Sequence, residues 1–330
     1  MQRTDKTLVV LGTGGTIAGT AASAGDNIGY TAAQLGVATL VKAVPALAGV
    51  PLETEQVAQV DSKDMGDAVW RALVARVAHH LARPEVAGLV VTHGTDTLEE
   101  TAWLLQRVLA PAKPVVLTAA MRPATSLQPD GPQNLLDAVT VARHPGAQGV
   151  VAVLGGVVHG AADVAKVHTY RIDAFDSGDA GPVARIEEGR VRVFRPWPAG
   201  QALGAGVVAP EAWPRVGIVL SHAGVDGLLV DALVQQGARG IVAEREYTAE
   251  EWPEASPEQR RGMTHLRHAF WSRPHFVAYW VDELPAVAPW IAHNIFGLPL
   301  LTWTVRTPEQ RARAARHADQ MIFEGFLPGT

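Results

Sequence analysis

Residues 7–20 read TLVVLGTGGTIAGT, an apolar run that passes directly into a loop of glycines and threonines. This pattern is typical of a buried parallel strand whose carboxyl end carries a ligand-binding loop. The loop does not fit a dinucleotide fingerprint, because the third glycine of that motif would fall on Ile17, and no Lys-Ser or Lys-Thr pair completes a P-loop. Thr13 and Thr16 therefore either cap a structural turn or bring a hydroxyl to a substrate.

The same rhythm of apolar runs, polar loops and helical periodicity recurs along the chain and predicts an α/β protein with a mostly parallel sheet covered by helices. In the first half, buried strands are expected at 7–12, 88–94, 114–120 and 149–155. Between them, residues 65–81 have apolar positions at spacing four, and residues 96–114 form a second helical segment that ends at its prolines.

A change in composition suggests where the domains divide. Residues 1–190 are expected to form a large N-terminal catalytic domain, and a Pro-, Gly- and Ala-rich stretch over 191–213 is expected to be a linker. Residues 214–330 are expected to form a smaller C-terminal α/β domain. Its strands are predicted near 216–220, 240–244, 275–280 and 299–305.

Composition excludes several function classes. The chain has 330 residues, of which 48% are apolar, and its net charge of −5 leaves no basic surplus for a nucleic-acid partner. The N-terminal apolar run is too short for a signal peptide or a membrane span, so a cytoplasmic protein without a membrane partner is expected. The absence of cysteine excludes disulfides and thiol catalysis.

A second threonine loop occurs in VVTHGTDTLEET, residues 90–101. It also leaves a predicted strand and enters a helix, so Thr95 and Asp96 should lie at the same sheet edge as Thr13. Asp96 or Thr97 could cap that helix, with Glu99 and Glu100 favoured at its positive end. Two hydroxyls beside a carboxylate also suit amide hydrolysis, which needs a nucleophile, a proton acceptor and donors for an oxyanion.

The segments TGGTIAG and THGTDTLEET resemble the two signature loops of bacterial L-asparaginases. Four further stretches, at 61–65, 119–139, 159–169 and 173–186, extend the resemblance over most of residues 6–240. It implies an amidohydrolase that converts L-asparagine, or also L-glutamine, to the amino diacid and ammonia. It also implies a homo-oligomer, dimer or tetramer, with sites between paired subunits and with no metal or organic cofactor.

The resemblance also assigns catalytic roles. Thr13 would attack the substrate's amide carbonyl, and Tyr30 would handle the proton of Thr13. Thr95, Asp96 and Lys166 would form a second cluster of hydroxyl, carboxylate and amine, which activates either the nucleophile or the water that resolves the acyl-enzyme.

Substrate contacts follow from the same resemblance. In the Gly94–Thr95 loop, the N–H of Thr95 would stabilise the oxyanion, and Asp96 would also meet the α-ammonium. The carbonyl of Ala120 would accept from the departing nitrogen, and Ser62 would hold the α-carboxylate. Lys63 stands where relatives commonly carry a neutral polar residue, so it could pair with the carboxylate or block a longer side chain such as glutamine.

Each of these residues also has a structural interpretation. Lys166 taken alone would usually be solvated, although burial can lower the pKa of a lysine toward that of a base. Tyr30 could anchor its loop, and Ser62 could cap the helix that follows it. Four histidines have spacings that could suggest metal ligands: His79, His80, His265 and His268. No set of carboxylates or cysteines accompanies them, so these histidines are expected on the surface of helices.

The C-terminal part departs from the family pattern. After residue 243 the resemblance predicts a glycine-rich turn ending in Asn, but the chain reads EREYTAEEWPEASPEQRRG. From about Glu244 onward the sequence instead resembles the last strands and helices of glycerophosphodiester phosphodiesterase barrels, as either a gene fusion or a divergent domain. A complete phosphodiester site is not expected, because that barrel's metal ligands come largely from earlier strands. The alternative to an active asparaginase is a catalytically impaired amino-acid-binding protein with this segment fused to it.

Overall fold

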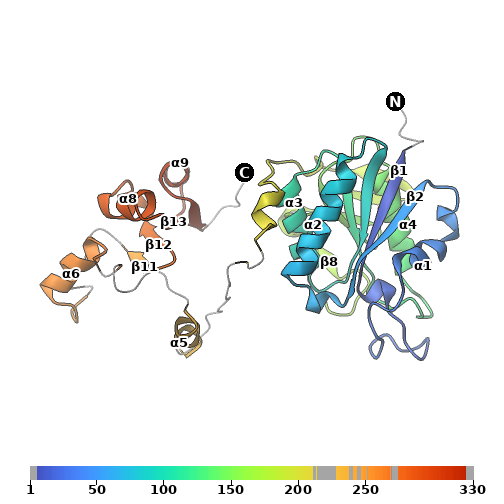
Figure 1. Ribbon diagram of the computed structural model, residues 1–330, viewed down its shortest axis with the longest axis horizontal. Helices are drawn as coiled ribbons and strands as arrows, with labels where there is room; N and C mark the ends of the chain where they lie inside the picture. The colour runs from blue at the N-terminus through green and yellow to red at the C-terminus, as the bar shows by residue number, and fades with distance from the viewer. Residues whose placement is uncertain are drawn as a thin grey trace. The chain divides into compact units, whose positions relative to one another are not determined.

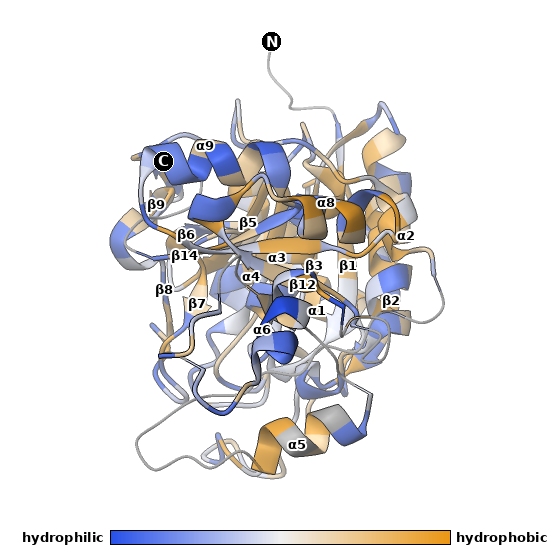
Figure 2. Cartoon of the chain, turned by 90° about the vertical axis from the view of Figure 1, so that its left-hand side faces the viewer, coloured by the Kyte–Doolittle hydropathy of each residue, from blue (hydrophilic) through white to orange (hydrophobic). Residues whose placement is uncertain are grey.

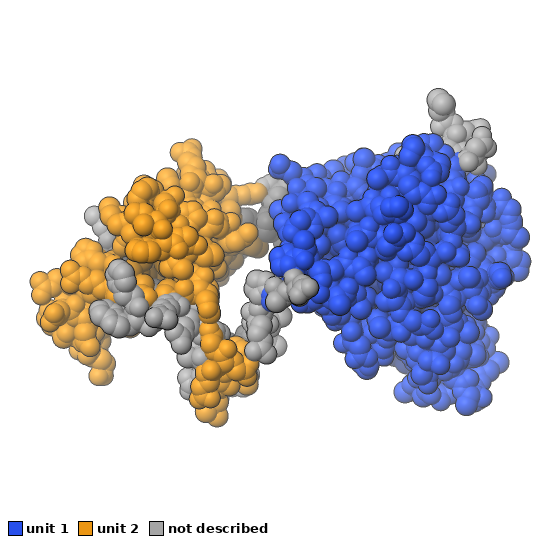
Figure 3. Space-filling model, viewed as in Figure 1, with its two compact units in different colours: residues 1–214 blue, residues 215–330 orange. Residues whose placement is uncertain are grey.

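The computed structural model describes residues 6–210, 213, 228–237, 241–243, 247–250, 252–267, 269 and 274–324. Contacts within it divide the chain into two compact units, residues 1–214 and 215–330, which are coloured separately in Figure 3. Within these described ranges, none of the helices combines the length and the apolar content needed to cross a membrane.

The first unit is built on an eight-stranded sheet (Figure 1). Its strands in chain order are β1 Thr7–Gly14, β2 Leu52–Val60, β3 Val86–Thr92, β4 Val115–Thr118, β5 Val150–Leu154, β6 Val157–Gly160, β9 Ala184–Glu187 and β10 Arg190–Val193. Across the sheet they follow the order β10-β9-β6-β5-β4-β3-β1-β2. The five neighbouring strands β5, β4, β3, β1 and β2 are parallel to one another. Strands β6, β9 and β10 extend the sheet beyond β5 with antiparallel pairing.

Helices cover both faces of this sheet because its strands are apolar on both sides. Alternate residues of β1 enter two separate cores: Val9 and Leu11 pack with α2 Asp67–Ala82 and α3 Leu98–Leu109. Leu8 and Val10 pack on the other face, with α1 Val37–Lys42 and α4 Gly131–Ala142 (Figure 1). This arrangement confirms the predicted α/β class with a mostly parallel sheet.

The apolar runs located most of the parallel strands, but not the sheet edges. The strands expected at 7–12, 88–94, 114–120 and 149–155 correspond to β1, β3, β4 and β5. By contrast, β2 reads LETEQVAQV and lies at an edge of the sheet, largely accessible to solvent, so it lacks a continuous apolar run. The antiparallel extension of β6, β9 and β10 was also not anticipated.

Several residues within 191–213 contact the first unit. Val193 ends β10, and Leu203 donates its N–H to the carbonyl of Arg107 at 2.9 Å. Val208 is buried in the core that contains α3, and the ring of Trp213 stacks on Trp70 of α2 with centroids 6.1 Å apart. This stretch thus contributes a strand and core side chains to the unit.

The second unit contains a four-stranded parallel sheet in chain order, β11-β12-β13-β14. Its described elements are α5 Leu228–Gln235, β11 Ile241–Ala243, α6 Pro257–Thr264, β12 Val277–Trp280, α8 Val287–Asn294, β13 Leu300–Val305, α9 Pro308–His317 and β14 Gln320–Phe323. The strands predicted near 240–244, 275–280 and 299–305 are therefore present, whereas residues 216–220 lie outside the described residues. Figure 2 shows α8 and α5 as largely hydrophobic and α6 and α9 as largely hydrophilic.

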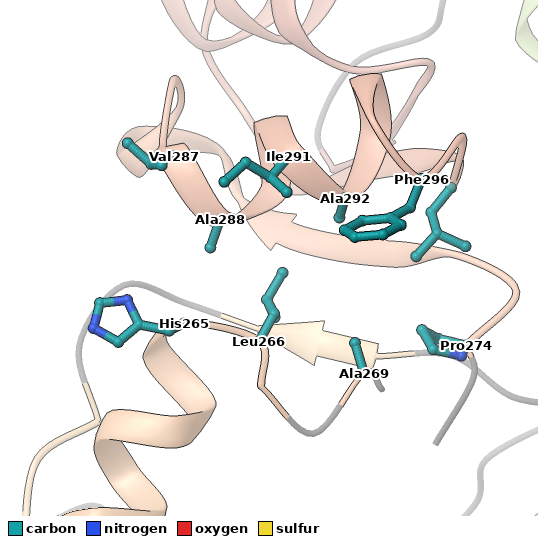
Figure 4. Close-up of a pocket in the computed structure, with 10 residues that line it drawn as sticks. His265, Leu266, Ala269, Pro274, Val287, Ala288, Ile291, Ala292 and Phe296 are labelled. Carbon is teal, nitrogen blue, oxygen red and sulfur yellow. The ribbon is translucent and has the colours of Figure 1, made fainter. Parts of the chain in front are cut away.

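An apolar groove of about 880 Å³ lies within this second unit, between α8 and the segment that follows α6 (Figure 4). In Figure 4, Leu266 points toward Ala288 and Ile291 across the groove, and Phe296 lies beside Ala292. Among the described residues that line it, His265 is the one with a titratable side chain. The described part of the lining therefore lacks the combination of acids, bases and nucleophiles that hydrolysis requires.

Burial of Asp137 in α4 gives a prediction about stability. The residue is 5% exposed, its carboxylate accepts a hydrogen bond from Gln133 Nε2 at 2.8 Å, and burial raises its pKa above the usual 3.8. A raised carboxyl pKa means that the folded state binds more protons than the unfolded state, so ionisation at pH 7 costs stability. Asp137→Asn should therefore raise the free energy of unfolding at pH 7.

Urea denaturation of the two proteins at pH 7 and at lower pH measures this difference. The gain of Asp137→Asn should shrink as the pH falls toward 3.8, because the buried carboxyl, whose pKa is raised, becomes protonated in the folded wild type. A variant that is less stable than the wild type at pH 7 would contradict the assignment of an unfavourable buried charge.

Candidate active site

The two threonine loops leave the sheet from the same edge. Strands β1 and β3 are parallel neighbours, with Gly12 opposite Thr92, so the residues that follow each strand emerge side by side. At Gly15, where φ is 79°, an added Cβ would lie 2.3 Å from the Cα of Gly94. The loops are therefore in backbone contact, and glycine is needed at position 15 both for its φ and for this approach.

Thr13 lies at the base of the first loop. Its side chain is almost completely buried, and its hydroxyl donates to the carbonyl of Thr92 at 3.0 Å. This bond joins the end of β1 to the end of β3, three residues before Thr95. The structure therefore holds Thr13 against the strand that carries the second loop.

Tyr30 contacts a different threonine from the one that the resemblance implies. Its Oη lies 2.6 Å from Thr16 Oγ1, and the backbone bridge between Thr20 and Thr31 closes the loop that carries it. Tyr30 thus connects the far end of this loop to the 3-10 turn at Thr16–Ala18. The contact fits a loop anchor at least as directly as a group that handles the proton of Thr13.

The hydroxyl, amine and carboxylate of Thr95, Lys166 and Asp96 form one cluster. Lys166 Nζ donates to Thr95 Oγ1 at 2.8 Å and to Asp96 Oδ1 at 2.7 Å. The side chain of Lys166 is 19% exposed, and Asp96 is half exposed, so the cluster faces solvent on its carboxylate side. Since 70 residues separate Asp96 from Lys166, only the fold brings these groups together.

Ser62 connects this cluster to the turn that follows strand β2. It begins the 3-10 turn Ser62–Asp64 after β2, and its side chain is buried. Ser62 Oγ accepts the N–H of Asp96 at 3.1 Å, and Ser62 O accepts the hydroxyl of Thr97 at 2.9 Å. An added Cβ on Gly94 would lie 2.3 Å from Ser62 Oγ, so these segments pack without space for a side chain.

The two remaining predicted contacts differ in burial. Lys63 is 62% exposed on its side chain and bonds Asp64 at 2.5 Å, and this hydrogen bond raises the pKa of the lysine above its ordinary value. Ala120 is fully buried just after β4. The chain around it is fixed by Asp130, whose carboxylate accepts the N–H of Met121 at 2.9 Å and that of Arg122 at 3.0 Å.

A buried histidine, His93, is hydrogen-bonded to the backbone of the second loop. His93 Nδ1 donates to Gly94 O at 2.8 Å, and His93 Nε2 accepts from Thr101 Oγ1, which in turn accepts from Trp70 Nε1. Complete burial lowers the pKa of His93 to about 4, so the ring is neutral at pH 7. The Gly94–Thr95 peptide is held at its carbonyl end by this chain of bonds.

The expected surface position of His80 is wrong. Its side chain is 5% exposed, and Nε2 lies 2.8 Å from Glu55 Oε2 on the edge strand β2, where Arg76 shares the same carboxylate. The contact arises because the last turn of α2 packs against β2, which the sequence did not reveal as a strand. His79 is exposed as expected, and His268 lies outside the described residues.

Sequence reasoning also missed a contact of Glu99. Its Oε2 accepts the main-chain N–H of Lys166 at 2.7 Å, across 67 residues of chain. The position of Glu99 in the first turn of α3 suggested only a favourable charge at a helix end. Within the described ranges no three His, Asp or Glu side chains are grouped so that they could hold a metal ion.

The contact between the loops gives a second prediction about stability. Gly15→Ala would place a methyl group against the backbone of Gly94, at a residue whose φ is positive. The free energy of unfolding should therefore fall by about 3 kcal/mol. Gly66→Ala is the matched control, because its Cβ would have no atom within 4 Å and its φ is −139°. Thermal melts of both variants measure the difference, and equal melting temperatures would contradict the tight loop contact.

Comparisons with known proteins match this part of the chain to asparaginases. The family model described as "Asparaginase, N-terminal" matches residues 7–199. The chain is 38% identical over 242 residues to L-asparaginase 2 of Escherichia coli, and 36% identical over 241 residues to a probable periplasmic L-asparaginase of Haemophilus influenzae; each match covers 72% of this chain and 68% of the relative. A probable cytoplasmic L-asparaginase from Campylobacter jejuni has a similar structure, with a TM-score of 0.69, 32% identity and 83% coverage of both chains.

Proposed function

The chain belongs to the asparaginase family, and from this premise we propose that Thr13 and the Thr95–Lys166–Asp96 cluster hydrolyse the side-chain amide of L-asparagine through an acyl-enzyme. The enzyme is an amidohydrolase of the L-asparaginase type. The observation that carries the proposal is the position of Lys166 Nζ, which is bonded to Thr95 Oγ1 and Asp96 Oδ1 beside the loop that holds Thr13.

In the first step, Thr13 Oγ1 attacks the amide carbonyl, and its proton passes to the Thr95–Lys166 pair. The hydroxyl of Thr13 donates to Thr92 O in the free protein, so it must exchange that bond for a basic acceptor as it attacks. The N–H of Thr95 stabilises the oxyanion, and the carbonyl of Ala120 accepts from the departing nitrogen. The C–N bond breaks, and ammonia leaves with the transferred proton.

In the second step, water attacks the ester on Thr13. The same Thr95–Lys166 pair removes a proton from the water, and the proton returns to Thr13 Oγ1 as aspartate leaves. Ser62 holds the α-carboxylate of the substrate, and Asp96 holds its α-ammonium, so both ends of the amino acid are fixed while the amide reacts. Tyr30 acts on Thr13 only through Thr16 or after its loop moves, because its hydroxyl is bonded to Thr16.

Three features of the wider protein are part of this proposal. The enzyme is a cytoplasmic homo-oligomer, dimer or tetramer; the structural relative from Campylobacter jejuni is named cytoplasmic, although the Haemophilus relative is named periplasmic. Lys63 disfavours glutamine, because its ion pairs with Asp64 and Asp61 keep a cation beside Ser62. The segment after Glu244 derives from the end of a phosphodiesterase barrel, which its three parallel strands in chain order, β12 to β14, would suit.

The test is an assay of the purified full chain with L-asparagine and with L-glutamine, in which aspartate or glutamate and ammonia are both quantified. Equal amounts of aspartate and ammonia from asparagine are expected, with slower release from glutamine. Binding of aspartate without any ammonia release would instead support the amino-acid-binding alternative. Hydrolysis of glycerophosphocholine that depends on a divalent metal would show that the C-terminal segment has its own activity.

A further inference from the structure

Glu99 is the group that connects the helix after the second loop to the backbone of Lys166. Its Oε2 accepts the main-chain N–H of Lys166 at 2.7 Å. A carboxylate that accepts a backbone N–H forms a shorter and stronger bond than a neutral acceptor. The bond therefore joins the first turn of α3 directly to the chain that carries the amine of the site.

Lys166 needs such an anchor because its own strand is very short. It lies in β7 Ala165–Lys166, which pairs only with β8 Phe175–Asp176 in a separate two-stranded sheet. Residues 167–173 of the connection between these strands are exposed, including the apolar side chains of Val167 and Tyr170, whereas Ala174 at its end is buried in the core that contains α3. Two residue pairs are a weak constraint on a hairpin in water, so contacts outside the hairpin must fix its position.

We propose that Glu99 is a positioning residue for Lys166, which fixes the main chain from which the amine reaches Thr95 and Asp96. The inference rests on the function proposed above. Both hydrogen bonds of Lys166 Nζ are short, 2.8 and 2.7 Å, so a shift of the backbone by about 1 Å would break at least one of them. The carboxylate that contacts Lys166 Nζ is that of Asp96, so Glu99 acts through the main chain.

A simpler role for Glu99 is a favourable charge at the positive end of α3. The two roles make different demands on the side chain. Aspartate keeps the charge in the first turn but is one methylene shorter, so it does not reach Lys166 N. Glutamine has the reach and an acceptor oxygen but no charge. Glu99→Asp and Glu99→Gln therefore separate positioning from the helix-charge effect.

The experiment compares these variants with the wild type and with Glu100→Gln, which removes the neighbouring exposed carboxylate. Steady-state kinetics with asparagine gives kcat and KM, amide hydrogen exchange monitors the N–H of Lys166, and thermal melts establish that each variant folds. Glu99→Asp should lower kcat by about 10²-fold with little change in KM, because the amine is displaced rather than the substrate site. Exchange at Lys166 should become faster by about 10-fold or more in this variant.

Glu99→Gln and Glu100→Gln should keep kcat within about 3-fold of the wild type, with slow exchange at Lys166. If Glu99→Asp does not fold, Glu99→Ala provides the second loss variant. Wild-type kcat and slow exchange in Glu99→Asp, or equal losses in the Asp and Gln variants, would overturn the inference. If the wild type releases no ammonia, the proposed function fails, and the exchange at Lys166 alone decides whether Glu99 fixes this segment.

Discussion

Replacing Lys166 by methionine should lower kcat for asparagine hydrolysis by about 10³-fold, because no other described side chain is bonded to the hydroxyl of Thr95. Methionine fills a similar volume, so the variant should fold. Lys166→Arg should remain nearly as inactive, since a guanidinium stays protonated and cannot accept a proton. Ammonia release at saturating asparagine measures each loss.

The control for Lys166→Met is Lys6→Met, at an exposed lysine that donates to Pro84 O far along the chain. It should leave kcat unchanged. Full recovery of activity in Lys166→Arg would mean that the site needs only a positive charge, and the proposed proton transfer through this amine would then be wrong. Activity in Lys166→Met within about 10-fold of the wild type would exclude any direct role for Lys166.

Replacing Thr13 by valine should reduce turnover even further, by about 10⁴-fold, because valine has the shape of threonine without the nucleophilic oxygen. Thr13 is buried, and within the described residues its hydroxyl bonds Thr92 O, so the substitution removes this hydrogen bond and leaves no cavity. Thr13→Ser is the matched control, since it keeps the hydroxyl.

Ammonia release by the two Thr13 variants is compared at saturating asparagine, and aspartate binding is measured in parallel by calorimetry. Thr13→Ser should keep activity within about 10-fold of the wild type, and both variants should still bind aspartate. Rapid ammonia release by Thr13→Val would show that another group attacks the amide.

The sequence predicted the centre of the sheet well because the residues that form it have an unambiguous pattern. Strands β1, β3, β4 and β5 are buried on both faces, so each reads as a continuous apolar run. The edge strand β2 is mostly polar, and its position depends on pairing with β1 rather than on its own composition. Such long-range pairing leaves no local signal.

The sequence predicted the position of the two loops of the candidate site, but not its long-range contacts. The two glycine-threonine loops follow apolar strands, so their meeting at one sheet edge could be expected from topology. The roles of Tyr30, Ser62 and Lys166 came only from the family resemblance. The contacts of Glu99 and His80 join residues 67 and 25 positions apart, so only the folded chain reveals them.

The central claim is that Thr13 carries the acyl group during turnover. The most direct measurement is to quench the enzyme in acid during hydrolysis of asparagine, digest it, and identify the modified peptide by mass spectrometry. We expect an aspartyl ester on the peptide that contains Thr13, absent from Thr13→Val. An ester on the peptide that contains Thr95, or on any other peptide, would contradict the account.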